Sequence, residues 1–285
     1  MTSKIWYGCS DYTWPKLSHD AALQLIRGMG FEAVDLGLFY GATHVKPERV
    51  MKDVPTSADE LNRKLEGIGL MAGDVFLTPG SDFTTRAPND PNKKGIEEAI
   101  AMFTAIADFT KRINGKGITV LPGSPIGSQS NEEARTNAVE TLKRYVEIAY
   151  TYDLEVSFEP HDKSSTPTPM EAIDLVELVP GLKITLDASH FEYAGFDVAS
   201  YGDIYPHTRH VQVRCASPKV MQAIFVENTI DLTLMIRNLL RSGYSGGLVC
   251  EYVWIPTWEC RRVDNVSETV VLLEELRGLV SANSH

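Results

Sequence analysis

The sequence predicts a (β/α)8 barrel, in which eight parallel strands form a central ring and helices surround them. Eight apolar runs of strand length alternate with helical patterns along about 250 residues, as is typical of this barrel. A Gly-x-Gly junction also recurs. "IRGMGFEAVDL" (26–36), "LEGIGLMAGDVFL" (65–77) and "INGKGITVL" (113–121) each lead from a helix end into an apolar run. A doubly wound open sheet is the alternative, but no glycine-rich nucleotide turn follows the first run.

The strands are expected directly after these junctions. A glycine just past a helix permits the positive φ that ends it, and the β-rich run that follows is typical of a buried strand. No linker, low-complexity tract or second domain is evident, so residues 1–285 are expected to form one domain. We predict strands at 4–9, 31–36, 70–77, 117–121, 154–159, 182–187, 209–214 and 247–252.

Helix starts are marked by capping residues. "TSADELNRKLEGIG" (56–69) contains a capping box formed by Ser57 and Glu60. In "TPMEAIDLVELVPG" (168–181), Thr168 is expected as the N-cap, with Pro169 at the first helical position and Glu171 at the third. Further helices fit residues 92–112, 131–151, 230–242 and 265–279.

Composition limits the classes of partner. Hydrophobic residues make up 43% and charged residues 23%, as in an ordinary globular protein. The net charge of −11 argues against nucleic acid or an anionic membrane as the main partner. The first residues, "MTSKIWYGCS", contain no apolar signal region. Cys215 and Cys250 lie in apolar runs and are predicted to be buried, reduced thiols. A reducing cytoplasm is therefore the expected location.

Polar residues occur at the same relative place in four consecutive predicted strands. "LEVSFEPH" contains Glu159, "LKITLDASH" contains Asp187 and then His190, "RHVQVRC" contains Gln212, and "GLVCEYV" contains Glu251. Their neighbours in each strand are apolar and can face the helices, so the polar side chains are expected to face the barrel axis. The carboxyl ends of barrel strands form the active-site face, which makes these residues candidates for a site.

Buried carboxylates require a cation or another partner. Glu159, Asp187 and Glu251 would repel one another strongly without one. With the amide oxygen of Gln212 they form an all-oxygen set, which suits Mg2+ or Mn2+ better than zinc. Each residue alone is more often an ordinary surface or salt-bridged side chain, and His210 in the same strand is open to a structural role. Their recurrence in four strands favours a metal site.

Several motifs together carry a family resemblance. "FEAVDL", "SFEPH", "LDASHFEYAG", "HVQVRCAS" and "GYSGGLVCEY" resemble the sugar isomerase/epimerase group of xylose-isomerase-like TIM barrels. This group includes ketose 3-epimerases, hydroxypyruvate isomerases, inosose dehydratases and, distantly, endonuclease IV. The resemblance spans nearly the whole chain. It implies one divalent cation, Mn2+ first and Mg2+ or Co2+ as alternatives, held by Glu159, Asp187, Gln212 and Glu251.

The resemblance also implies an activity. The cation would bind a carbonyl and the adjacent hydroxyl of a small sugar or keto-acid and stabilise an enediolate. Glu159 and Glu251 would remove and return the proton as an acid/base pair. The expected substrate-binding residues are His161, His190 and Arg214, and His190 is equally suited to orient Asp187.

Two departures from the family pattern concern the seventh strand. The third metal ligand is usually the second histidine of H-x-H, whereas this chain has Gln212 there, as the hydroxypyruvate isomerases do. The ketose 3-epimerases resemble "HxHxGExxxR", and the place of that arginine falls near Pro218 in this chain. Hydroxypyruvate isomerases resemble "HVQIAD", and this chain has Arg214 and Cys215 at the last two positions. Arg214 is suited either to hold an anionic substrate group or to neutralise the acidic site.

Four classes of function are compatible with such a barrel to different degrees. A metal-dependent isomerase or epimerase comes first, and a lyase or dehydratase on the same site, including C-glycoside cleavage, is the alternative. A DNA-repair nuclease needs more histidines at strand ends, and a vestigial subunit would not require two glutamates. The expected partners are a small carbohydrate or keto-acid and other copies of the chain in a dimer or tetramer, without nucleic acid or membrane.

Overall fold

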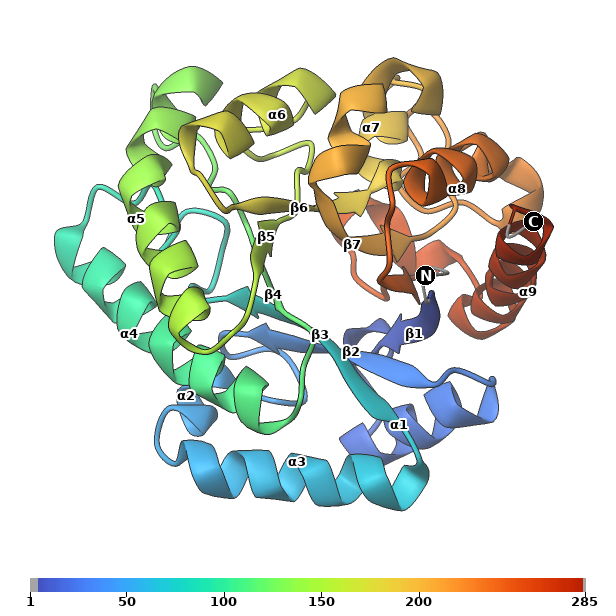
Figure 1. Cartoon of the computed structure of the whole chain (residues 1–285), viewed down its shortest axis with the longest axis horizontal. Helices are drawn as coiled ribbons and strands as arrows, with labels where there is room; N and C mark the ends of the chain where they lie inside the picture. The colour runs from blue at the N-terminus through green and yellow to red at the C-terminus, as the bar shows by residue number, and fades with distance from the viewer. Residues whose placement is uncertain (1–4, 284–285) are drawn as a thin grey trace.

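A computed structural model describes residues 5–283, and its strands close into one parallel barrel (Figure 1). Each strand pairs with the next, and β8 pairs with β1, so the predicted (β/α)8 fold is confirmed. The strands are β1 Trp6–Ser10, β2 Ala33–Phe39, β3 Met71–Thr78, β4 Ile118–Val120, β5 Val156–Phe158, β6 Lys183–Asp187, β7 Thr208–Val213 and β8 Gly247–Cys250. All eight overlap the predicted runs, although residue 4 of the first run lies outside the described residues.

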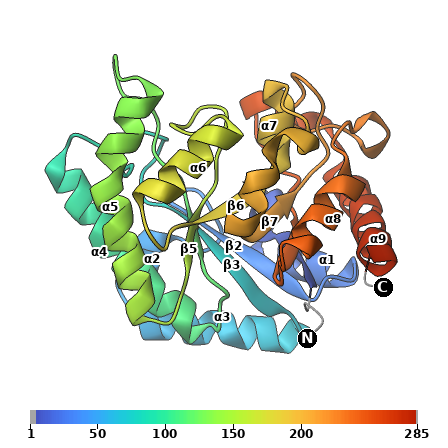
Figure 2. The same ribbon diagram turned by 45° about the horizontal axis from the view of Figure 1, so that its top comes forward.

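Helices surround the barrel on all sides, as Figures 1 and 2 show. The apolar side chains that point outward from the strands, such as Val34, Ile118 and Leu186, are fully buried against them. No helix within residues 5–283 is long and apolar enough to cross a membrane. The helices are α1 His19–Gly28, α2 Pro47–Val50, α3 Val54–Ile68, α4 Lys93–Arg112, α5 Asn131–Thr151, α6 Pro169–Leu178, α7 Ala188–Ala194, α8 Leu232–Arg241 and α9 Asn265–Asn283.

One helix start agrees with the prediction and one does not. At α6 the Thr168 hydroxyl accepts a hydrogen bond of 3.2 Å from the Glu171 amide, so the predicted N-cap is confirmed. The predicted capping box at Ser57 and Glu60 is wrong, because α3 already begins at Val54. Asp53 caps it by accepting a hydrogen bond of 3.0 Å from the Thr56 amide.

A polar network fills the lower interior of the barrel. The register between β6 and β7 shifts so that Arg209 is an extra residue in β7, a β-bulge that lets its side chain turn inward. Its guanidinium makes two hydrogen bonds of 2.8 Å to the two carboxylate oxygens of Asp74. The next residue, His210, lies 2.6 Å from Asp35. These pairs satisfy buried charges inside the barrel. The interior at the carboxyl ends of the strands is occupied by different side chains, which are described below.

Candidate active site

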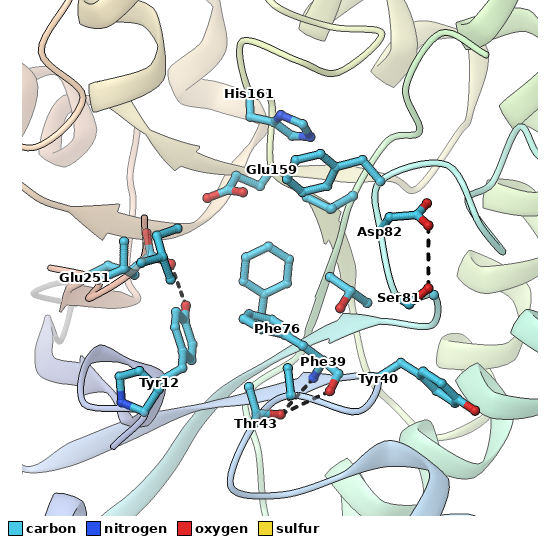
Figure 3. Close-up of a pocket in the computed structure, with 18 of the residues that line it drawn as sticks. Tyr12, Phe39, Tyr40, Thr43, Phe76, Ser81, Asp82, Glu159, His161 and Glu251 are labelled. Carbon is cyan, nitrogen blue, oxygen red and sulfur yellow. Dashed lines mark hydrogen bonds between the residues drawn. The ribbon is translucent and has the colours of Figure 1, made fainter. Parts of the chain in front are cut away.

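A cavity of about 350 Å³ opens at the carboxyl ends of the strands. Its size lies within the range of small-molecule sites, about 300–1,000 Å³. Its walls are largely apolar, and Phe39, Phe76 and Tyr12 contact one another through their rings. Trp258 also lines the cavity, and its indole donates a hydrogen bond of 3.1 Å to Asp162. Figure 3 shows Tyr12, Glu159, His161 and Glu251 facing this cavity.

Two buried carboxylates, Glu159 and Glu251, line this cavity, and a third, Asp187, lies close to Glu159. Glu159 directly follows β5, Asp187 ends β6 and Glu251 directly follows β8, and each is at most 6% exposed. Ligand atoms of Glu159, Asp187 and His190 lie within 4.8 Å of one another. The structure therefore places Glu159 and Asp187 close together, while Glu251 lies outside this group of ligand atoms and is connected to Asp187 through Arg214.

Tyr12 links the fourth predicted ligand, Gln212, to Glu251. The Tyr12 hydroxyl donates a hydrogen bond of 2.6 Å to Glu251 Oε1 and accepts one of 2.9 Å from Gln212 Nε2. A phenol has a single proton, so its oxygen faces the amide nitrogen of Gln212 and not the amide oxygen. These two hydrogen bonds leave Gln212 Oε1 buried with no hydrogen-bond partner among residues 5–283.

A glycine in β2 makes room for Tyr12. A Cβ atom at Gly37 would lie 2.5 Å from Tyr12 Cδ1, closer than two carbons approach without overlap. The amide of Gly37 also donates a hydrogen bond of 2.9 Å to Asp11, the residue before Tyr12. The second strand therefore sets the position of the phenol.

Arg214 extends into the acidic cluster from the end of β7. Its Nη2 atom lies 2.7 Å from Asp187 Oδ2 and 4.0 Å from Glu251 Oε2, and the residue is 4% exposed. Its Nε donates a hydrogen bond of 2.8 Å to the hydroxyl of Ser189. Of the two roles that the sequence allows, the geometry places the guanidinium against the carboxylates.

Two histidines complete the wall near β5 and β6. Arg214 Nη2 lies 3.1 Å from His190 Nε2, and because a guanidinium only donates, this nitrogen is the acceptor. Burial lowers the pKa of His190 well below its usual value, and the charge of Arg214 lowers it further. Burial, followed by the nearby His190 and Lys163, lowers the pKa of His161 in the same way. Both imidazoles are therefore neutral at pH 7.

The two glutamates hold protons more tightly than an exposed glutamate does. Burial and the charges of Glu251 and Asp187 raise the pKa of Glu159 well above its usual value. Burial raises the pKa of Glu251 to about 7, although Arg214 and the hydrogen bond from Tyr12 oppose the rise. Environments that set the proton affinities of two neighbouring carboxyls are a feature of acid/base sites.

The set of donors fits a divalent cation. Glu159 accepts no hydrogen bond from any described residue, and Gln212 Oε1 and Glu251 Oε2 are buried without a hydrogen-bond partner there. Oxygens without hydrogen-bond donors, contributed by the ends of three strands of one barrel, suit a hard cation. His190 adds a nitrogen at the same point, one that the all-oxygen set inferred from the sequence does not include.

Sequence reasoning missed the polar role of Tyr12 and the contact from Ser189. Tyr12 follows β1 as Glu159 follows β5, and Ser189 comes two residues after Asp187. Extending the strand-end rule to the first strand would have identified Tyr12 as a candidate site residue. Nothing in the local sequence pairs Ser189 with Arg214, because the two residues meet only across β6 and β7.

Several solved structures share this fold over nearly the whole chain. D-psicose 3-epimerase from Clostridium cellulolyticum H10 superposes with a TM-score of 0.76 at 14% identity, over 96% of this chain and 99% of that one. The 3-keto-D-glucoside 4-epimerase YcjR from E. coli gives 0.72 at 16%, over 96% and 100%. IOLI, described with a bound zinc atom, gives 0.73 at 17%, over 98% and 99%.

Sequence comparison gives two further results. No curated protein sequence compared with the chain matches it. A family model described as "Xylose isomerase-like TIM barrel" matches residues 23–276, a span that contains every site residue described above except Tyr12. With the closed barrel, this match establishes that the chain belongs to the xylose isomerase-like TIM barrel family.

Proposed function

We propose that the protein is a divalent-cation-dependent isomerase or epimerase of a small sugar or keto-acid. The observation that carries this proposal is the pair of buried glutamates, Glu159 and Glu251, which face one cavity beside the unpartnered amide oxygen of Gln212. Metal retention alone would not require two candidate bases. The activities named for the structural neighbours from C. cellulolyticum and E. coli, both epimerisations of sugars, support the same class.

The cation would be held by Glu159, Asp187, Gln212 and Glu251, and Mn2+ is the first choice, with Mg2+ or Co2+ as alternatives. When bound, it would act as a Lewis acid on a carbonyl and an adjacent hydroxyl and so acidify the C–H bond between them. The oxygen-rich donor set favours these metals over zinc.

The protein's own residues would move the proton. Glu159 and Glu251 would remove it from one face of the substrate carbon and return it to the same or the other face. Tyr12 holds one oxygen of Glu251, which fixes the direction of its carboxylate. The neutral His161 and His190, at the cavity wall, would hydrogen-bond to substrate hydroxyls, and Arg214 is the third predicted substrate-binding residue.

A lyase on the same site is the second candidate. Enolisation followed by loss of a β-substituent needs the same proton abstraction and a differently placed acid. The apolar wall formed by Phe39, Phe76, Val253 and Ile255 favours a substrate with an apolar group, such as the aglycone of a C-glycoside.

Hydrogen exchange tests both candidates. Mn2+-loaded protein is incubated in D2O with D-tagatose, D-psicose, D-fructose or hydroxypyruvate, and proton NMR measures deuterium incorporation at the carbon beside the carbonyl. An isomerase incorporates deuterium without elimination, whereas a dehydratase gives a conjugated enone that absorbs in the ultraviolet. Metal analysis accompanies the assay. Failure to retain a divalent ion after Mn2+ reconstitution would exclude the proposed cation site.

The remaining expectations concern the assembly and the location. We propose a homodimer or homotetramer, which light scattering after size-exclusion chromatography measures directly. A small-molecule substrate, the absence of a nucleic-acid partner and a cytoplasmic location stay predictions.

A further inference from the structure

Arg214 contributes a positive charge to the acidic cluster. Its Nη2 atom lies 2.7 Å from Asp187 Oδ2 and 4.0 Å from Glu251 Oε2. No other lysine or arginine of the described residues forms an ion pair with Asp187, Glu159 or Glu251. The guanidinium is therefore the positive charge that the buried acidic cluster has available from the protein itself.

The contacts of Asp187 set the conditions for metal binding. Its Oδ1 atom accepts a hydrogen bond of 2.9 Å from the Ser189 amide, as the N-cap of α7, and its Oδ2 atom accepts the one from Arg214. An ion that binds Asp187 through Oδ2 would lie within a few Å of the guanidinium, and two positive charges that close together in a buried site repel strongly.

Arg214 cannot reduce this repulsion by losing its proton, because a guanidinium stays charged in proteins. It can, however, move, since its side chain lines the cavity of about 350 Å³, whose lining does not include Asp187. Ser189 opposes the movement through its hydrogen bond of 2.8 Å to Nε.

We propose that Arg214 is the resident counter-ion of the acidic cluster and that a divalent cation binds by exchange, taking the place of the guanidinium as it swings into the cavity. Ser189 is a positioning residue that holds the guanidinium against Asp187. This inference rests on the cation site of the proposed function, and it makes the affinity for the cation a property that Arg214 and Ser189 control.

The test measures Mn2+ affinity and not catalysis. Metal-free wild-type protein and the variants Arg214→Met and Ser189→Ala are titrated with Mn2+, and the electron paramagnetic resonance signal of free Mn2+ gives Kd. Exchange predicts that Arg214→Met binds Mn2+ about tenfold to a hundredfold more tightly, since a repulsive charge is gone. Ser189→Ala should bind it several-fold more tightly, because only the restraint on the guanidinium is lost.

Arg262→Met is the matched control. Arg262 is an exposed arginine of the loop after β8 that pairs with Glu259, and its removal changes the net charge as Arg214→Met does. It should leave Kd unchanged. Circular dichroism confirms that each variant is folded, and Ser189→Ala, which removes only a hydroxyl, carries the test if Arg214→Met does not fold.

The outcomes separate this inference from the proposed function. Tight binding by the wild type with the same Kd in Arg214→Met and Ser189→Ala would overturn the exchange and leave the cation site standing. Absence of Mn2+ binding in all four proteins would overturn both. An equal gain in affinity in Arg262→Met would assign the effect to net charge, and the exchange would again be wrong.

Discussion

The hydroxyl of Tyr12 donates a hydrogen bond of 2.6 Å to Glu251 Oε1 and accepts one of 2.9 Å from Gln212 Nε2. One phenol from the end of the first strand thus orients two groups from the seventh and eighth strands. It leaves both the amide oxygen of Gln212 and Glu251 Oε2 free of hydrogen bonds to described residues. Two of the four proposed cation ligands owe their direction to this side chain.

Removing the Tyr12 hydroxyl should shift the pH dependence of activity. A hydrogen bond to a charged group is worth about 1.5–3 kcal/mol, so Tyr12→Phe should lower kcat/KM by about tenfold to a hundredfold. The bond lowers the pKa of Glu251, so its loss should move the acid limb of the pH profile to higher pH. Tyr145→Phe is the control, because the hydroxyl of Tyr145 is buried without a hydrogen-bond partner among residues 5–283. An unchanged acid limb in Tyr12→Phe would contradict the claim that the hydrogen bond from Tyr12 lowers the pKa of Glu251.

Neutralising either buried glutamate should remove turnover while the protein stays folded. Glu159→Gln and Glu251→Gln each replace a proposed acid/base group by an isosteric amide, and the expected loss in kcat is about a hundredfold to ten-thousandfold. Glu155→Gln is the matched control, since Glu155 is an exposed residue just before β5, the strand that Glu159 follows. Activity assays with circular dichroism check both points. Near-normal rates in either variant would show that the acid/base pair is wrongly assigned.

The order of the strands and the acidic strand ends could be predicted from sequence because both depend on local patterns. Glycines after helices and period-two alternation mark the strands, and Glu159, Asp187 and Glu251 interrupt apolar runs at one relative place. The true cap of α3, Asp53, was missed because the residues at 57 and 60 match a capping box equally well.

Contacts between distant strands could not be predicted in this way. Ser189 and Arg214 lie 25 residues apart in the chain, and Tyr12 and Glu251 lie 239 apart. The inward turn of Arg209 depends on a bulge in the pairing of β6 with β7, and the sequence of β7 alone does not reveal that register. The chemical type of the site could thus be inferred, but the partner of each site residue could not.

The metal-free protein should lose stability as the pH rises toward neutrality. Glu251 keeps its proton up to a pKa of about 7 in the folded state, against 4.5 as an ordinary glutamate, so unfolding releases a proton between these values. Raising the pH therefore favours unfolding. At about 1.4 kcal/mol for each tenfold change in proton affinity, the free energy of unfolding should fall by about 3 kcal/mol over this range.

Glu251→Gln isolates this effect, because a glutamine does not titrate. Urea denaturation of the wild type and of this variant, both in EDTA, at pH 4.5 to 8 provides the measurement. The difference in free energy of unfolding should widen in favour of the variant up to about pH 7 and then stay constant. A difference that is independent of pH would mean that burial does not raise the pKa of Glu251.

The pair of Asp74 and Arg209 should stabilise the barrel without acting in the site. Both side chains are nearly inaccessible and form a bidentate ion pair below the acidic cluster, so Asp74→Asn leaves a buried guanidinium without its counter-charge. Such a loss typically costs about 3–5 kcal/mol, to be measured as the free energy of unfolding in urea. The exposed pair of Arg49 and Glu60 provides the contrast, since Glu60→Gln should cost less than about 1 kcal/mol. Mn2+ affinity should stay unchanged in both variants, because neither touches Glu159, Asp187 or Glu251. A loss of Mn2+ binding in folded Asp74→Asn would show that the pair of Asp74 and Arg209 also determines the geometry of the acidic cluster. The pair would then not act on stability alone.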